Sequence, residues 1–291
     1  MGYASILRGD CFSGETHVVT GGGSGIGRCV AHELASLGAH VVITGRKQDK
    51  LDRVLGEIAE DGGSAEAHAF DIRDEEAVKV AIAAIVASRG RIHGLVNNAG
   101  GQFPAPMQLI SKKGFDAVVS NNLTGGFLVM REVFLQSMQA YGGAIVNMAA
   151  DMWRGMPGMA HSGAARAGMV NLTKTAAYEW GPSGVRVNCV APGWIASSGM
   201  DTYGGMTRTL IPQLKQHVPL RRIGVEAEVS SVICFLLSRA ASFVTGATVQ
   251  IDGGSPLGSA LFPISEGRGT EPFEGFHRAV VPDVLAEESP S

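Results

Sequence analysis

Cysteine is scarce in this sequence, which contains four among 291 residues. They stand far apart, at Cys11, Cys29, Cys189 and Cys234, and form no C-x-x-C pair of the kind that binds zinc. Isolated cysteines favour reduced thiols and argue against a disulfide framework. We therefore expect no metal site and a cytoplasmic location.

An excess of charge is also lacking. The chain has 24 Lys and Arg against 27 Asp and Glu, a formal net charge of −3, and its basic residues form no stripe. Phosphate backbones are bound by clustered cations, so we expect no nucleic acid as a partner. No apolar run reaches the roughly 18 residues of a membrane-spanning helix, and the first residues lack a signal-peptide core. We expect no membrane partner either.

The pattern that is present is a regular alternation of strands and helices. It runs from residue 17 onward, with no linker, repeat or low-complexity tract up to residue 254. This rhythm is typical of a parallel sheet with helices on both faces. We predict an α/β fold with a Rossmann-like, doubly wound, seven-stranded parallel sheet in a single domain, residues 1–254. Residues 255–291 form a C-terminal extension that we expect to pack on the core or on a neighbouring subunit.

A glycine-rich stretch, T-G-G-G-S-G-I-G over residues 20–27, joins the first expected strand to the first expected helix. A helix N-terminus offers unpaired N–H groups and the positive end of the helix dipole, so a pyrophosphate binds there when no Cβ blocks it. Between a strand and a helix, such a loop predicts dinucleotide binding. The residues expected to bind the cofactor here are Gly21, Ser24, Gly25, Ile26 and Gly27.

The end of the second expected strand predicts which dinucleotide binds. NAD sites place an acidic residue about 20 positions after the glycine loop, where it holds the ribose 2′-hydroxyl. This chain has Arg46 and Lys47 there and no carboxylate. Arginine holds a 2′-phosphate through a bidentate fork, and lysine adds a second charge. The sequence therefore favours NADP(H) over NAD(H), although Arg46 can also be explained as a solvated residue at a helix start.

The spacing T-G-x-x-x-G-x-G, together with N-N-A-G at residues 97–100, resembles the short-chain dehydrogenase/reductase family. The resemblance implies a substrate lid over 198–224 and a homotetramer. It also implies that Asn122 is the asparagine that holds a water near the active site. The further cofactor contacts that it implies are Asp71, Ile72, Asn98, Ala99, Gly100, Arg166, Pro192, Gly193, Ile195 and Ser197. Asp71 or Asp74 is equally natural as the cap of the helix that follows.

The family's usual catalytic pair, Tyr-x-x-x-Lys, is missing, because no tyrosine of this chain has a lysine four residues later. Counting back from the helix at residues 172–174 places the family's serine, tyrosine and lysine positions at Ala149, Ser162 and Arg166. A serine hydroxyl is a poor replacement for a phenol as proton donor, and arginine does not relay protons at neutral pH. Arg166 can still hold ribose hydroxyls. Cofactor binding is therefore expected, but carbonyl reduction by the usual route is not.

Three segments, residues 98–103, 161–168 and 228–231, resemble the peroxisomal trans-2-enoyl-CoA reductases, which with the 2,4-dienoyl-CoA reductases also move or lose this tyrosine. In reduction of a conjugated C=C bond, charge develops on the thioester oxygen and needs hydrogen-bond donors. Ser162 and Asn122 are the candidate donors, and His161 and Asp151 are candidate proton sources. His161 is equally well explained as a buried wall residue, and Asp151 is better explained as a turn residue.

Three functions stay open. The favoured one is an NADP(H)-dependent reductase of an α,β-unsaturated acyl-CoA. The second is an alcohol or aldehyde dehydrogenase acting on an acyclic terpenoid such as citronellol, because residues 276–285 also resemble proteins of citronellol breakdown. The third, a nucleotide-binding pseudoenzyme, would not need the nicotinamide-side segment 192–197. The Met-rich loop 151–159 is expected to line an apolar pocket for the acyl or terpenoid chain.

Overall fold

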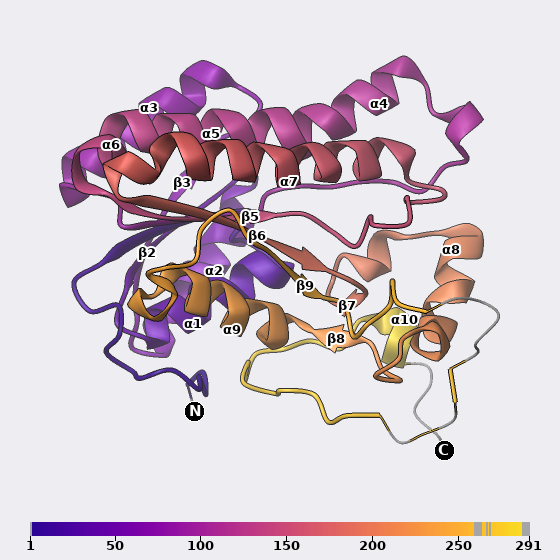
Figure 1. The fold of residues 1–291 in the computed structure, drawn as a ribbon. Coiled ribbons are helices and arrows are strands. Elements are labelled where there is room, and N and C mark those ends of the chain that lie inside the picture. Colours follow the sequence, from indigo (N-terminus) through magenta and orange to yellow (C-terminus); the bar gives the residue numbers. More distant parts are fainter. Residues whose placement is uncertain (1, 259–263, 266, 268, 287–291) are drawn as a thin grey trace.

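The computed structural model describes residues 2–258, 264–265, 267 and 269–286, and it has three layers (Figure 1). The middle layer is a sheet of seven parallel strands in the order β3-β2-β1-β4-β5-β6-β9. The strands are β1 (Thr16–Thr20), β2 (His40–Gly45), β3 (Ser64–Ala69), β4 (Gly94–Asn97), β5 (Gly143–Met148), β6 (Val185–Pro192) and β9 (Thr248–Ile251). The predicted doubly wound sheet is confirmed. Its order reverses between β1 and β4, where such sheets bind ligands.

Helices cover both faces of the sheet (Figure 1). On one face lie α1 (Gly25–Ser36), α2 (Gln48–Glu60) and α9 (Glu226–Leu237). On the other lie α3 (Glu75–Arg89), α7 (Ala160–Trp180) and the long helical segment between β4 and β5. These helices begin and end close to where their apolar spacing predicts.

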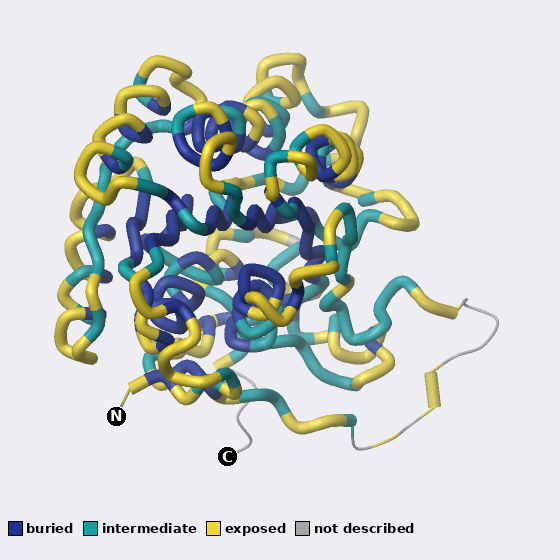
Figure 2. Tube along the Cα trace, turned by 60° about the vertical axis from the view of Figure 1, so that its left-hand side comes forward, coloured by how far each residue is buried: buried dark blue, intermediate teal, exposed yellow. Residues whose placement is uncertain are grey.

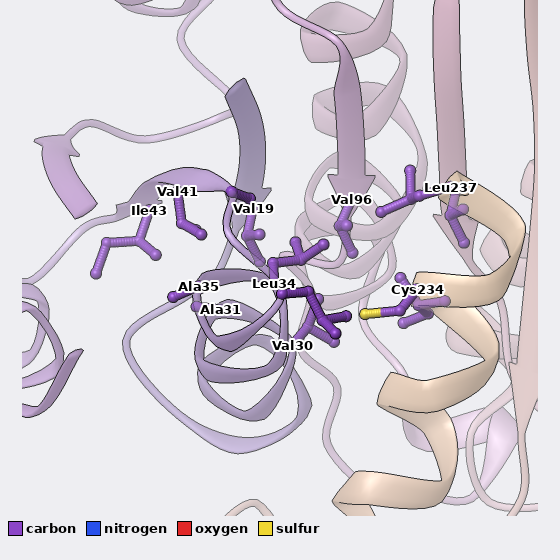
Figure 3. Close-up of a cluster of buried hydrophobic side chains, with 14 of the residues drawn as sticks. Val19, Val30, Ala31, Leu34, Ala35, Val41, Ile43, Val96, Cys234 and Leu237 are labelled. Carbon is purple, nitrogen blue, oxygen red and sulfur yellow. The ribbon is translucent and has the colours of Figure 1, made fainter. Parts of the chain in front are cut away.

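The core beneath α1 fixes the glycine loop (Figure 3). Val19 and Val96 point from the sheet toward Val30 and Leu34 of α1, and Leu237 of α9 closes the cluster. The strands at the centre of the molecule are buried throughout (Figure 2). Burying each such aliphatic side chain stabilises the fold by about 1.5–3 kcal/mol. The first turn of α1 is therefore held on a rigid base.

The helix predicted over 111–141 is not regular along its length. It consists of α4 (Lys112–Val119), α5 (Gly125–Val133) and α6 (Gln139–Tyr141), joined by π-helical turns η2 (Ser120–Thr124) and η3 (Phe134–Met138). A short 3₁₀ turn, η1 (Met107–Leu109), precedes it. Single π turns occur frequently at functional sites. The first one contains Asn122, the asparagine singled out by the sequence.

The segment 198–224, predicted to be weakly periodic, folds into short helices that the sequence did not reveal. They are η5 (Met200–Thr202), α8 (Gly205–Leu210) and η6 (Ile211–His217). The segment ends in β8 (Gly224–Val225), which pairs with β7 (Ile195–Ala196). Elements of two to seven residues are too short to show a hydrophobic period. We refer to residues 198–224 as the lid.

The C-terminal extension packs at two places on the same chain. Phe276 is buried against Tyr3 and Cys29, with the guanidinium of Arg28 5.0 Å from its ring centre. Further on, Val284 of α10 (Asp283–Ala286) is buried in an apolar cluster of the lid. Residues 259–263, among them Phe262, and residues 266, 268 and 287–291 lie outside the described residues.

Two short turns complete the fold, η4 (Gly181–Ser183) after α7 and η7 (Arg239–Ala241) after α9. In the part of the chain that the structure describes, no helix has the length and apolar character to span a membrane. The same residues contain no group of three or more His, Cys, Asp or Glu side chains placed to hold a metal ion.

Candidate active site

The glycine loop after β1 exposes backbone at the end of the sheet. Gly21 and Gly25 have φ angles of +69° and +58°, which favour glycine. A Cβ on Gly27 would lie 2.4 Å from the carbonyl oxygen of Gly21 and 2.5 Å from Nδ2 of Asn98. Any side chain at position 27 would therefore separate α1 from β1 and β4. This close approach is what a dinucleotide loop requires.

The N-terminus of α1 fits an anion. Ser24 is its N-cap residue, yet within the described chain its hydroxyl makes no capping hydrogen bond, and the first turn contains no acidic residue. The first N–H groups of the helix are therefore left to another acceptor. Such groups, together with the helix dipole, bind phosphate oxygens. Ser24, Gly25, Ile26 and Gly27 are the residues that would hold a pyrophosphate.

A cleft of about 200 Å³ continues from this loop along the ends of β2, β3 and β4. It unites most of the residues that the sequence assigned to the adenosine half of the cofactor. Its lining includes Gly21, Ser24, Arg46, Lys47, Asp71, Ile72, Ala99 and Gly100. It also includes Lys50 and Asn121, which the sequence did not single out. Lys50 follows Lys47 by about one helical turn, a spacing that the sequence shows.

The two explanations of Asp71 and Asp74 separate in the structure. Asp74 caps α3 by accepting a hydrogen bond from the amide of Ala77 at 3.1 Å. Asp71 instead accepts from Nε of Arg73 at 2.9 Å and lines the cleft. The Arg73 guanidinium holds the pKa of the Asp71 carboxyl below its usual value, with a smaller contribution from Arg46. Asp71 is therefore an ionised acceptor in the lining of the cleft.

Asn98 acts on the loop that follows β4. Its Nδ2 donates to the carbonyl oxygen of Thr20 at 2.9 Å. The Thr20 hydroxyl oxygen in turn accepts from the amides of Asn98 and Ala99, at 3.0 and 2.9 Å. Because its amide group is occupied, Asn98 fixes the backbone of residues 98–100 beside the cleft. Thr20 thus also holds this part of the chain in place. In the sequence, only its position at the start of the glycine-rich stretch pointed to it.

Arg166 is a buried cation next to Gly100, a residue that lines the cleft. Its Nη1 donates to the carbonyl oxygen of Met148 at 2.6 Å, and a Cβ on Gly100 would lie 2.7 Å from its Nη2. Among the described residues its Nε has no hydrogen-bond partner. Burial lowers the pKa of this guanidinium to about 10. A buried donor with unused N–H groups fits the hydroxyls of a ribose.

Asn122 is bound to the chain through both ends of its amide. Its Nδ2 donates to the carbonyl oxygens of Gly101, at 2.6 Å, and of Val118, at 2.8 Å. Its Oδ1 accepts from the amide of Gly101 at 3.1 Å. Asn122 therefore positions the loop that carries Gly100 and Gly101, and its amide protons are already used.

Ser162 and His161 lie on the first turn of α7, and both are fully buried. The Ser162 hydroxyl donates to Oε1 of Gln102. Nδ1 of His161 accepts from the Ser162 amide at 2.8 Å, so the neutral ring carries its proton on Nε2. That Nε2 has no partner among the described residues, and the ring packs edge-on against Phe103. Gln102 is thus a site residue that the sequence did not assign.

The segment after β6 closes the other side of the loop. A Cβ on Gly193 would lie 2.8 Å from Cβ of Asp252, and a Cβ on Gly25 would lie 4.0 Å from Cβ of Ser197. The same Cβ on Gly25 would lie 3.9 Å from Oε1 of Glu226, which is buried. Burial raises the pKa of the Glu226 carboxyl to about 7. Ser197 therefore lies beside the glycine loop, and Glu226 is a neighbour that the sequence did not indicate.

A larger cavity, about 490 Å³, lies beyond this segment, between Trp194, Arg222 and Asp252. It shares Ile195 with the predicted cofactor contacts. Ser162 and Arg166 line neither this cavity nor the cleft. Arg166 lies next to Gly100, which lines the cleft, and it is therefore on the cleft side of the molecule that the candidate site lies.

Known proteins are similar to this chain in sequence and in fold. A family model described as enoyl-(acyl carrier protein) reductase matches residues 21–255. The peroxisomal 2,4-dienoyl-CoA reductase of Danio rerio is 35% identical over 261 residues, which are 89% of this chain and 87% of the relative. The citronellol catabolism dehydrogenase AtuB of Pseudomonas aeruginosa PAO1 is 62% identical, with a TM-score of 0.79 over 87% of this chain and 99% of that one. A candidate NAD(P)-dependent gluconate 5-dehydrogenase of Beutenbergia cavernae, solved with NADP at low occupancy, is 34% identical, with a TM-score of 0.79 over 85% and 98%.

Proposed function

Because the chain belongs to the short-chain dehydrogenase/reductase family and is an oxidoreductase of that type, we propose that it reduces the C=C bond of an α,β-unsaturated acyl-CoA with NADPH. The observation that carries the proposal is the amino-acid sequence of α7, in which Ser162 and Arg166 stand at the positions of the family's usual tyrosine and lysine. A site without that pair is suited to a substrate whose negative charge is spread over a conjugated thioester. The likeness to a 2,4-dienoyl-CoA reductase supports the same class.

Bound NADPH would supply the hydride, and the residues of the cleft determine where it lies. The first turn of α1 would hold the pyrophosphate, Asp71 and Ile72 the adenine, and Arg166 the ribose beside the nicotinamide. Arg46, Lys47 and Lys50 gather three positive charges at one end of the cleft. A 2′-phosphate would neutralise these charges, which supports NADP(H) over NAD(H).

A second function has one specific observation in its favour. The 62% identity to a citronellol catabolism dehydrogenase supports an acyclic terpenoid as substrate, either as the alcohol or aldehyde or as the chain of the thioester. The Met-rich loop after β5, with Met152 packed against Ala149 and Val170, suits a branched apolar chain.

The test is NADPH oxidation by the purified protein with crotonyl-CoA, a longer enoyl-CoA, citral and citronellal. Turnover of thioesters alone supports the proposed function, and turnover of aldehydes alone supports the second. No turnover with any of them, while NADPH still binds, indicates a pseudoenzyme. NADH in place of NADPH tests the cofactor choice in the same assay.

We also propose a homotetramer in the cytoplasm. The family resemblance implies the tetramer, and large apolar side chains exposed on α5, η3 and α9, namely Phe127, Leu135 and Phe235, support it. All four cysteines are free, which is compatible with a reducing compartment. Light scattering of the purified protein measures the assembly directly.

A further inference from the structure

Tyr203 of the lid reaches the first turn of α7. Its hydroxyl oxygen accepts a hydrogen bond from Nε2 of Gln102 at 3.0 Å. Oε1 of the same glutamine accepts the hydroxyl proton of Ser162. Three segments far apart in the sequence thus meet: the loop after β4, the start of α7 and the lid. A phenol lies one side chain away from the position at which the family carries its tyrosine.

Counting protons shows which of these groups can still donate. Ser162 gives its single hydroxyl proton to Gln102, and Asn122 gives its amide protons to Gly101 and Val118. The Tyr203 oxygen only accepts from Gln102, and its own O–H has no acceptor among the described residues. A phenol is also a stronger hydrogen-bond donor than an alkyl hydroxyl. Tyr203 is therefore the hydroxyl with a proton to offer.

The lid holds the Tyr203 ring in place by apolar packing. The ring lies against a cluster with Met200 and Ile211, which α10 completes through Val284. The amide of Val284 donates to Oδ1 of Asp201, two residues before Tyr203, at 3.2 Å. The C-terminal extension thus supports the lid from behind, and phenylalanine in place of Tyr203 would keep this packing.

We propose that Tyr203 donates a hydrogen bond to the carbonyl oxygen of the bound thioester and is a catalytic residue of this enzyme, with Gln102 as its positioning residue. The assignment rests on the proposed function. Hydride addition to the β-carbon, with NADPH as reductant, moves the π electrons of the C=C bond onto the thioester oxygen. The Tyr203 O–H stabilises that oxygen without losing its proton, and a proton from water then adds to the α-carbon.

The alternative is that Ser162 donates, which requires the Gln102 amide group to turn so that its oxygen and nitrogen exchange places. Two variants separate these cases. Tyr203→Phe removes the phenol proton and keeps the ring, and Ser162→Ala removes the serine hydroxyl. Tyr178→Phe is the matched control, because Tyr178 lies on α7 but is 87% exposed.

The variants are compared in kcat with an enoyl-CoA, in NADPH affinity by fluorescence, and in affinity for the saturated acyl-CoA in the presence of NADP⁺. Loss of one oxyanion donor lowers kcat by about 100-fold, so we expect that loss for Tyr203→Phe, with weaker binding of the saturated thioester and unchanged NADPH affinity. Tyr178→Phe should match the wild type in all three measurements.

Each other outcome contradicts a stated part of the proposal. Tyr203→Phe within twofold of the wild type in kcat and in thioester binding overturns the assignment of Tyr203. A loss confined to Ser162→Ala transfers the role to Ser162. A wild-type protein that neither reduces nor binds thioesters overturns the proposed function, and the Tyr203 assignment falls with it.

Discussion

The proposed adenosine end of the cleft and the proposed substrate end beside it are built by different means. The adenosine end is shaped mainly by backbone: Gly21, Gly25 and Gly27 form the loop, and the start of α1 has no capping side chain and no acidic residue in its first turn. At the substrate end, side chains connect to one another across the fold, as in the contacts of Gln102 with Ser162 and Tyr203. At the first end an added Cβ at Gly27 would clash with backbone, whereas the second end depends on particular hydrogen bonds.

The largest effect is expected from Gly27→Ala. Its new Cβ would lie 2.4 Å from the carbonyl oxygen of Gly21, so α1 must move and the pyrophosphate site widens. Overpacking of this kind costs about 1–3 kcal/mol. Because about 1.4 kcal/mol is a factor of ten in affinity, we expect NADPH affinity to fall by up to about 100-fold. Fluorescence titration measures it.

The control for this variant is Gly56→Ala on α2, where an added Cβ meets no atom within 4 Å. That change should leave the affinity unaltered and raise stability slightly, because alanine favours a helix more than glycine does. If Gly27→Ala binds NADPH as the wild type does, the adenosine end is not limited by backbone geometry.

The next effect concerns Asn122→Ala at the substrate end. Loss of its three bonds to Gly101 and Val118 frees the loop that carries Gln102. We expect kcat to fall by about tenfold or more, as for a misplaced catalytic group, while NADPH affinity falls less, through Gly100 of the same loop. Steady-state kinetics measure the first and titration the second. A fall in NADPH affinity with kcat unchanged would show that Asn122 serves the adenosine end.

The contrast also explains what the sequence could predict. The glycine loop, Arg46 and Asp71 each follow directly after a strand of the sheet, so the period of the strands locates them at the same edge. Gln102 and Tyr203 are 101 residues apart, and their contact depends on the packing of a lid made of turns too short for a period to reveal. In the sequence, Glu226 looks like any acidic residue at the start of a helix. Only the structure shows that it is buried, which distinguishes it from the exposed acidic residues at other helix starts.

A smaller effect is expected from Arg46→Ala. Removing this guanidinium takes away one partner of a 2′-phosphate and leaves Lys47 and Lys50 in the cleft. One charge-assisted hydrogen bond contributes about 1.5–3 kcal/mol, so NADPH affinity should fall by about tenfold or more while NADH affinity stays the same. Titrations with both nucleotides measure the ratio. Equal losses for both would remove Arg46 from the phosphate site.

The smallest effect is a pH dependence at Glu226, on the border between the two ends. Its carboxyl keeps a proton up to about pH 7 in the folded chain, well above its value of 4.5 when exposed, so the unfolding free energy falls as pH rises through this window. Arg28 opposes the shift, and the buried Cys29 thiol faces the same carboxyl.

Once ionised, Glu226 stands beside Gly25 and repels a pyrophosphate, so NADPH affinity should fall by about threefold between pH 6 and 8.5 after screening by salt. Glu226→Gln should flatten both profiles, because it stays neutral, whereas Glu76→Gln on the exposed start of α3 should leave them unchanged. If Glu226→Gln keeps the pH profile of NADPH binding of the wild type, the Glu226 carboxyl does not interact with the phosphates. The adenosine end then extends to Gly25 and does not include Glu226.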